Sequence, residues 1–172
     1  MEMKHLRQYI RKIIAESYKP SYKYLYHGTT EAAAEAIEKS GFDVSLVGTK
    51  SGDMANPGIS FTIDGDQAAE HALWALDGNF EKGAALVVVS TSGLRIMNGS
   101  EYNQLWDKLG DAGKAIEFAK EEGYDGVEYF DLETGHGIEE MEVLMINPNS
   151  IRVSHINYID PEDYPEIMDE YQ

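Results

Sequence analysis

The feature that most constrains the fold of this chain is an uninterrupted apolar run over residues 84–90, with the sequence AALVVVS. β-Branched side chains favour extended backbone, and an apolar run without polar alternation is typical of a strand covered on both faces. We therefore expect residues 84–90 to form a fully buried strand with other elements packed around it.

Shorter elements surround this run. Aromatic and β-branched residues predict strands, and Thr or Asp caps followed by a closing Gly predict helices. We expect strands over 23–27, 58–62, 127–130, 142–146 and 151–156, and helices from Thr29 or Thr30 to Lys39, from Asp64–Asp66 to Leu76, and over 114–122. Short strands interleaved with helices predict an α+β domain over residues 22–157.

The two ends of the chain differ in charge. Residues 1–16 hold four basic residues against two acidic ones, and Leu6, Ile10, Ile13 and Ile14 recur at helical spacing. This pattern predicts a basic amphipathic helix, which a linker over 17–21 joins to the domain. Six acidic residues and two prolines among the last thirteen residues predict an acidic, loosely held tail over 158–172.

Composition excludes several classes of function. The 172 residues contain no cysteine, which excludes disulfides, thiolate nucleophiles and Cys-based metal sites. A net charge of −17 argues against broad contact with nucleic acid, because phosphates need Lys and Arg. No apolar run reaches the length of a membrane span, and we expect no signal peptide. The five histidines lack metal-ligand spacing, so we expect no metal, and the chain fits a soluble protein of a reducing compartment.

Three short stretches place polar side chains on strands that are otherwise apolar. In Tyr26-His27-Gly28-Thr29, a strand-end His precedes a bare glycine backbone and a hydroxyl, although such a His is more often structural. In Gly58-Ile59-Ser60-Phe61-Thr62, alternation places Ser60 and Thr62 on one face, as an ordinary half-exposed strand also does. In Glu140-Met141-Glu142, both carboxylates share a face at the start of an apolar strand. Repulsion between them is expected to raise the pKa of one carboxyl group, unless the pair is simply the solvated start of the strand.

Together, in this order and spacing, the three stretches resemble the ADP-ribosyltransferase superfamily. That family has an Arg or His on its first strand, a Ser- or Tyr-containing second strand and a catalytic Glu at the start of a later strand. Residues 123–127 and 147–151 are also similar to the ends of related phage domains. The resemblance covers roughly residues 22–155. It implies two small, packed, mainly antiparallel sheets with flanking helices around an NAD cleft.

The resemblance also implies roles for individual residues. NAD is the expected substrate, bound by His27, Gly28, Thr29, Ser60, Phe61 and Thr62. Glu142 is the expected catalytic carboxylate that stabilises the oxocarbenium ion left when nicotinamide departs, and Ser60 is expected to orient it. Glu140, in the Glu-x-Glu form that goes with transfer to arginine, is expected to orient or deprotonate the acceptor. Family members with Glu-x-Glu usually carry Arg on the first strand, and His members usually carry Tyr at the position of Ser60, so this chain combines two patterns.

The first sixteen residues carry a second resemblance. A basic amphipathic segment ending in Ile14-Ala15-Glu16 is similar to the capsid-targeting peptides of large contractile-tailed phages, which are removed after Glu. The resemblance implies a protein packaged in the virion interior and injected into the host cytoplasm, although an ordinary first helix docked on the core fits equally well. The expected partner is a host protein, and the acidic charge favours a basic, nucleic-acid-binding one.

Three other functions fit parts of the pattern. An NAD glycohydrolase uses the same residues with water as the acceptor. RNA 2′-phosphotransfer shares the fold and the His-Gly-Thr opening, but that chemistry needs basic residues at the phosphate, and Glu140 and Glu142 argue against it. A non-catalytic acidic internal head or inhibitor protein can use the same fold as a scaffold.

Overall fold

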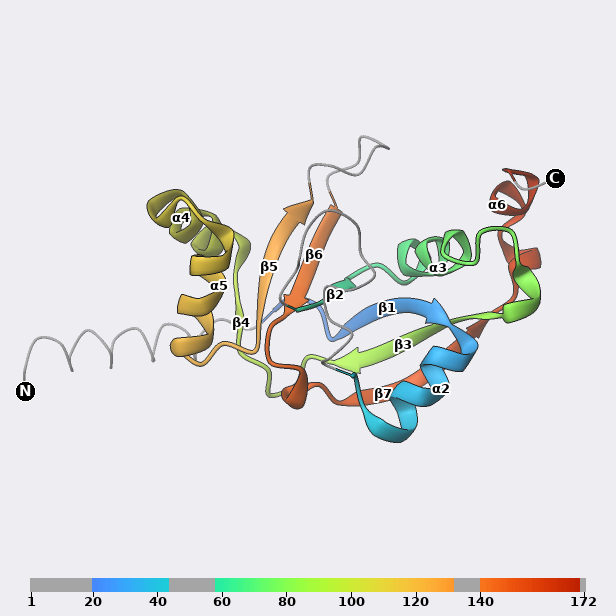
Figure 1. Ribbon diagram of the computed structural model, residues 1–172, viewed down its shortest axis with the longest axis horizontal. Coiled ribbons are helices and arrows are strands. Elements are labelled where there is room, and N and C mark those ends of the chain that lie inside the picture. Colours follow the sequence, from blue (N-terminus) through green and yellow to red (C-terminus); the bar gives the residue numbers. More distant parts are fainter. Residues whose placement is uncertain (1–19, 44–57, 132–139, 171–172) are drawn as a thin grey trace, which may run out of the picture.

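The computed structural model describes residues 20–43, 58–131 and 140–170 (Figure 1). Its helices are α2 (Glu31–Ser40), α3 (Gly65–Trp74), α4 (Gly99–Leu109), α5 (Ala112–Glu121) and α6 (Pro165–Glu170). Its strands are β1 (Tyr24–Thr30), β2 (Ile59–Thr62), β3 (Ala84–Ser90), β4 (Ile96–Met97), β5 (Gly126–Asp131), β6 (Glu140–Met145) and β7 (Val153–Ile159). The domain is therefore α+β, as the alternation of short strands and helices predicts.

The strands of the described residues form one seven-stranded mixed sheet in the order β4-β5-β6-β2-β1-β3-β7. All neighbours are antiparallel except β4 and β5, which are parallel. This differs from the two packed sheets that we expected. The reason lies at the centre, where β1 and β2 pair at Tyr26 and Thr62 alone among the described residues. That one pair joins two halves, which run in different directions in Figure 1.

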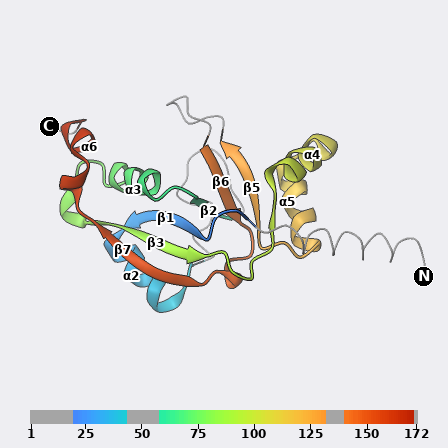
Figure 2. The same cartoon turned by 180° about the vertical axis from the view of Figure 1, so that it is seen from behind.

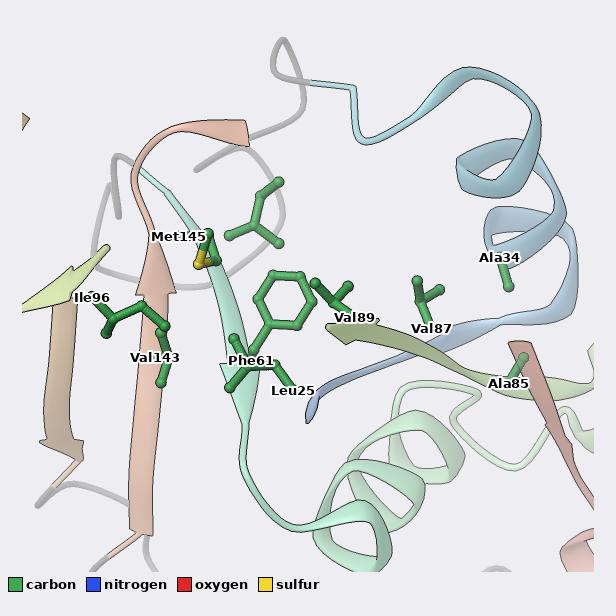
Figure 3. Close-up of a cluster of buried hydrophobic side chains, with 10 residues drawn as sticks. Leu25, Ala34, Phe61, Ala85, Val87, Val89, Ile96, Val143 and Met145 are labelled. Carbon is green, nitrogen blue, oxygen red and sulfur yellow. The ribbon is translucent and has the colours of Figure 1, made fainter. Parts of the chain in front are cut away.

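The apolar run over 84–90 forms β3, and its first six residues are buried. β3 is covered on both faces, as its uninterrupted apolar sequence predicts. On one face, Val87 and Val89 pack with Leu25, Phe61 and Ala34 of α2 (Figure 3). On the other face, Leu86 and Val88 pack with Ala68 and Ala69 of α3. The two helices therefore lie on opposite sides of the sheet, as both whole-chain views show (Figures 1 and 2).

Polar side chains fix where the helices begin. The Oγ1 of Thr30 accepts from the amide of Ala33 at 3.2 Å and caps α2, and Asp64 caps α3 by accepting from two amides of its first turn. Both caps match the sequence-based expectation. Helix α5 begins two residues earlier than expected, after the cap Asp111. Helix α4, capped by Asn98, was missed because most of its residues are polar and only a small apolar face is buried.

The expected loose tail is wrong for the described residues up to 170. Strand β7 extends through Ile159, and α6 then packs against the domain. Ile167 of α6 is 2% exposed and belongs to the apolar cluster of Leu73, Leu76 and Ala84. An apolar side chain among acidic neighbours is enough to dock this segment, because the acidic groups stay in solvent. The domain therefore continues beyond residue 157.

The N-terminal segment precedes the described residues, which begin at residue 20. The expected amphipathic helix over 1–16 and most of the linker lie outside the described residues. Within the part that is described, the helices are all too short or too polar to cross a bilayer.

Candidate functional site

Three polar side chains on three adjacent strands share one face of the sheet. Glu142 of β6 lies directly opposite Tyr129 of β5 on one side and Thr62 of β2 on the other. Ser60, two residues before Thr62, lies opposite Leu144. Because side chains alternate along a strand, Ser60, Tyr129 and Glu142 all point to the same side. The structure thus brings together two residues that the sequence singled out, and it adds Tyr129.

Hydrogen bonds connect these three side chains. The hydroxyl of Tyr129 donates to Oε2 of Glu142. The same hydroxyl lies 3.2 Å from Oγ of Ser60. All three side chains are half-buried, so the group is held by the sheet and still reaches solvent. The carboxylate of Glu142 thus has a defined position and is half-buried.

The group lies between two sets of helices on this face. Towards β1 and β3, the face is covered by α3, whose Ala68 and Ala69 pack on Leu86 and Val88. Along β5 and β6, Val127 and Leu144 are covered by the cluster that includes Tyr102 of α4 and Ile116 of α5. Ser60 and Glu142 lie between these two covered areas. Among the described elements, α3 covers the face on one side of this stretch and α4 and α5 cover it on the other, and Ser60 and Glu142 between them are half-buried.

His27 lies on the opposite face of the sheet. Its ring packs against Phe42 and Phe61, at centroid distances of 5.4 and 5.5 Å. Its Nδ1 lies 2.9 Å from the carbonyl oxygen of Ser60. A carbonyl can only accept, so Nδ1 carries the proton in this tautomer. The ring of His27 therefore contacts the backbone of β2 from the opposite side of the sheet, and it does not lie with the side chains of Ser60, Tyr129 and Glu142.

Burial sets the charge of His27. Removal of the ring from water lowers the pKa of His27 below the usual 6.5, and the hydrogen bond to Ser60 opposes this shift only in part. The ring is therefore neutral at neutral pH, because burial disfavours the charged form. A neutral His27 acts here as a structural donor to β2.

Gly28 and Thr29 follow His27 along β1, where the strand pairs with β3. A Cβ added to Gly28 would lie 2.1 Å from the carbonyl oxygen of Ala68. Glycine is thus required because the backbone of α3 lies directly on β1. Thr29 is half-buried opposite Ala85. The packing of α3 on β1 accounts for the glycine at position 28, and the expected cofactor-binding role of Gly28 and Thr29 stays a prediction.

Phe61 and Thr62 were expected to bind NAD, and in the structure their side chains contact other parts of the protein. Phe61 is 1% exposed and its ring lies in the core (Figure 3). The Oγ1 of the buried Thr62 donates to Oε1 of Gln67 at 2.6 Å and accepts from the amide of Asp64 at 3.0 Å. Phe61 therefore fills the core, and Thr62 organises the start of α3.

Glu140 is the first residue of β6, and its backbone pairs with Asp131 of β5. Its side chain lies outside the described part of the chain. The polar, glycine-containing sequence over 134–137 predicts a loop that binds or covers a ligand, and these residues also lie outside the described part of the chain. Within the described residues, no group of three or more His, Asp or Glu side chains is placed to hold a metal ion.

Two residues of β5 were missed by the sequence analysis. Tyr129 carries a hydroxyl two residues after the apolar Val127, on the same face of the strand, which is the signal that could have found it. Glu128, 5% exposed, lies on the other face, where Oε1 accepts from the hydroxyl of Tyr22 at 2.8 Å and Oε2 accepts from the amide of Gly99 at 3.0 Å. An acidic residue within a strand is its signal. Glu128 ties Tyr22 to the first turn of α4 and has a structural role.

Comparisons of this chain with family models, with curated proteins and with solved structures find no match. The geometry described above and the motifs of the sequence are thus the grounds for assigning a function.

Proposed function

We propose that this protein is a mono-ADP-ribosyltransferase that transfers ADP-ribose from NAD to a protein side chain, with arginine favoured. The observation that carries the proposal is the position of Glu142, whose half-buried carboxylate lies with Ser60 on one face of the sheet. These are the residues that the resemblance assigns to the catalytic carboxylate and to its supporting hydroxyl. Their convergence from two different strands is what the resemblance requires of an active member.

The reaction requires the protein to hold the two substrates in position and to supply a negative charge beside the ribose. The bond between the anomeric carbon of the ribose and the nicotinamide nitrogen breaks, and its electron pair leaves with nicotinamide. A lone pair of the acceptor forms the new bond to that carbon, and the acceptor loses a proton. The ribose develops positive charge between these events, and the fixed negative charge of Glu142 stabilises it.

The acceptor is assigned from the residue two positions earlier. Glu140 stands two residues before Glu142, in the Glu-x-Glu form that the resemblance links to transfer to arginine. In this proposal Glu140 orients the guanidinium or takes its proton. The net charge of −17 favours a basic host protein as the target.

We also propose that the protein is packaged in a phage particle and injected with the DNA. This part rests on the resemblance of residues 1–16 to capsid-targeting peptides. It predicts that protein isolated from particles begins at Ser17. An intact Met1 in particles would remove this part and leave the enzymatic proposal as it is.

The enzymatic proposal is tested by incubating the protein with NAD and a bacterial lysate, with intact-mass analysis of the proteins and chromatography of the nucleotides. We expect a host protein to gain the mass of one ADP-ribose. The Glu142→Gln variant should abolish this gain while its circular dichroism spectrum remains that of the wild type. Glu117→Gln, at an exposed position of α5, is the matched control and should retain the full activity.

Two other outcomes have definite meanings. Release of nicotinamide and free ADP-ribose without any modified protein, lost in Glu142→Gln, would make the protein an NAD glycohydrolase. Absence of both NAD binding and NAD consumption would overturn the enzymatic proposal and leave an acidic scaffold protein.

A further inference from the structure

We infer that Tyr129 is the positioning residue through which Ser60 acts on Glu142. The inference rests on the proposed function, because it concerns how the catalytic carboxylate is held. Tyr129 lies on β5, outside the three stretches that carry the resemblance.

The strand pairing shows why an intermediary is needed. Ser60 lies opposite Leu144, whereas Glu142 lies opposite Thr62. Ser60 and Glu142 are thus diagonal neighbours, and such positions are roughly 7–8 Å apart in an antiparallel pair. A serine side chain is short for that separation. Tyr129, directly opposite Glu142 on the other side, carries its hydroxyl on a long ring to a point within hydrogen-bond distance of both.

The direction of the hydrogen bonds follows from the number of protons that the carboxylate and the two hydroxyl groups can donate. An ionised carboxylate only accepts, and a phenol has a single proton. Because Tyr129 donates that proton to Glu142, the bond of 3.2 Å between Ser60 and Tyr129 requires Ser60 to be the donor. The order is thus Ser60 to Tyr129 to Glu142, and each donor polarises the next.

This arrangement has a catalytic consequence. A carboxylate that stabilises developing positive charge must be in place before the charge develops. Tyr129 sets the position of Oε2 of Glu142 by a charge-assisted hydrogen bond, and Ser60 sets the position of the Tyr129 hydroxyl. Loss of the hydroxyl should therefore slow the chemical step more than it weakens NAD binding.

A first experiment tests the connection without any activity. The protein is labelled with ¹³C-glutamate, and the carboxyl resonance of Glu142 is assigned by its absence in Glu142→Gln. We expect Ser60→Ala to shift this resonance in the wild-type background and to leave it unchanged in the Tyr129→Phe background. Equal shifts in both backgrounds, or no shift on Tyr129→Phe, would overturn the inference.

The matched control is Tyr124→Phe. Its hydroxyl also donates to a glutamate, Oε1 of Glu101 at 3.4 Å, but this glutamate belongs to helix α4 and not to the strands that carry Ser60, Tyr129 and Glu142. Tyr124→Phe should leave the Glu142 resonance and the transferase activity unchanged.

A second experiment measures the reaction. We expect Tyr129→Phe to lower kcat on the order of 10- to 100-fold with little change in KM for NAD, as a small misplacement of a catalytic group does. The double variant with Ser60→Ala should be no slower than Tyr129→Phe alone. A full kcat in Tyr129→Phe would overturn the positioning role and leave the transferase intact. An inactive wild type would overturn the transferase, and with it the role in catalysis, even where the resonances show the connection.

Discussion

Nδ1 of His27 and the carbonyl oxygen of Ser60 lie 2.9 Å apart, just beyond the one pair that joins β1 to β2 among the described residues. The donor comes from the face opposite the Ser60 hydroxyl. His27 therefore holds together the two halves of the sheet at the place where the candidate site is built. Its contribution to the site is the position of β2.

The lowered pKa of half-buried His27 predicts a loss of stability in mild acid. Burial lowers the pKa of His27 in the folded protein below the usual 6.5, so the unfolded chain binds this proton more readily. Stability is then fully present above pH 6.5 and falls as the pH drops towards the folded pKa, by at most about 1.4 kcal/mol per pH unit. Urea unfolding between pH 7.5 and 5 should show a shallower dependence in His27→Gln than in the wild type.

The control for this prediction is His155→Gln, at an exposed position of β7, which should retain the wild-type dependence. The same pH dependence in the wild type and in His27→Gln would show that His27 does not contribute.

The close approach of α3 to β1 predicts that Gly28→Ala is destabilising. The new methyl group would lie 2.1 Å from the carbonyl oxygen of Ala68, so the helix or the strand must move. Overpacking of this kind costs about 1–3 kcal/mol, measurable by urea unfolding. Gly65→Ala is the matched control at the start of α3, because its Cβ would meet the ring of Tyr26 at an ordinary 3.5 Å. Equal stabilities of the two variants would contradict the packing that we describe.

The docking of α6 predicts that Ile167→Ala is destabilising. Ile167 is 2% exposed in a cluster with Leu73 and Leu76, and truncation of a buried isoleucine costs about 2–5 kcal/mol. Thermal and urea unfolding should both report the loss. Glu166→Ala, exposed on the same short helix, should change stability little. A wild-type stability for Ile167→Ala would mean that the acidic segment is loosely held after all.

The buried carboxylate of Glu128 predicts a cost for Glu128→Gln. Its two oxygens accept from Tyr22 and from the amide of Gly99, and a glutamine offers only one oxygen. One donor then loses its acceptor, which costs about 1–3 kcal/mol. Denaturant unfolding should show this loss, whereas the proposed NAD-dependent activity per folded molecule should be unchanged. Loss of activity without loss of stability would instead place Glu128 in the reaction.

Local sequence patterns were enough to predict most of the elements. The apolar run over 84–90 forms β3, and Thr30 and Asp64 cap the helices that they were expected to begin. These are short-range effects, since capping and strand preference depend on near neighbours in the chain. Helices α4 and α6 were missed because their helical state depends on apolar side chains, such as Tyr102 and Ile167, that find partners far away in the sequence.

The candidate site was also predicted only in part from local sequence patterns. Alternation alone placed Ser60 on the face opposite Phe61 and marked Glu142 at the start of a strand. It could not show that β5 lies next to β6, and the hydroxyl of Tyr129 meets Glu142 only because of that pairing. Alternation also could not show that the side chain of Phe61 lies in the core, because alternation along one strand does not tell which face is buried.

By itself, the sequence determined the local elements of this protein, its acidic charge and the carboxylates on which a reaction at this site would depend. The tertiary structure decided that the strands form one sheet, that His27 supports Ser60 from behind and that Tyr129 joins Ser60 to Glu142. The physical reason is distance along the chain. Caps and periodicity act over a few residues, whereas strand order and the faces of a sheet are set by the burial of side chains that are far apart in the sequence.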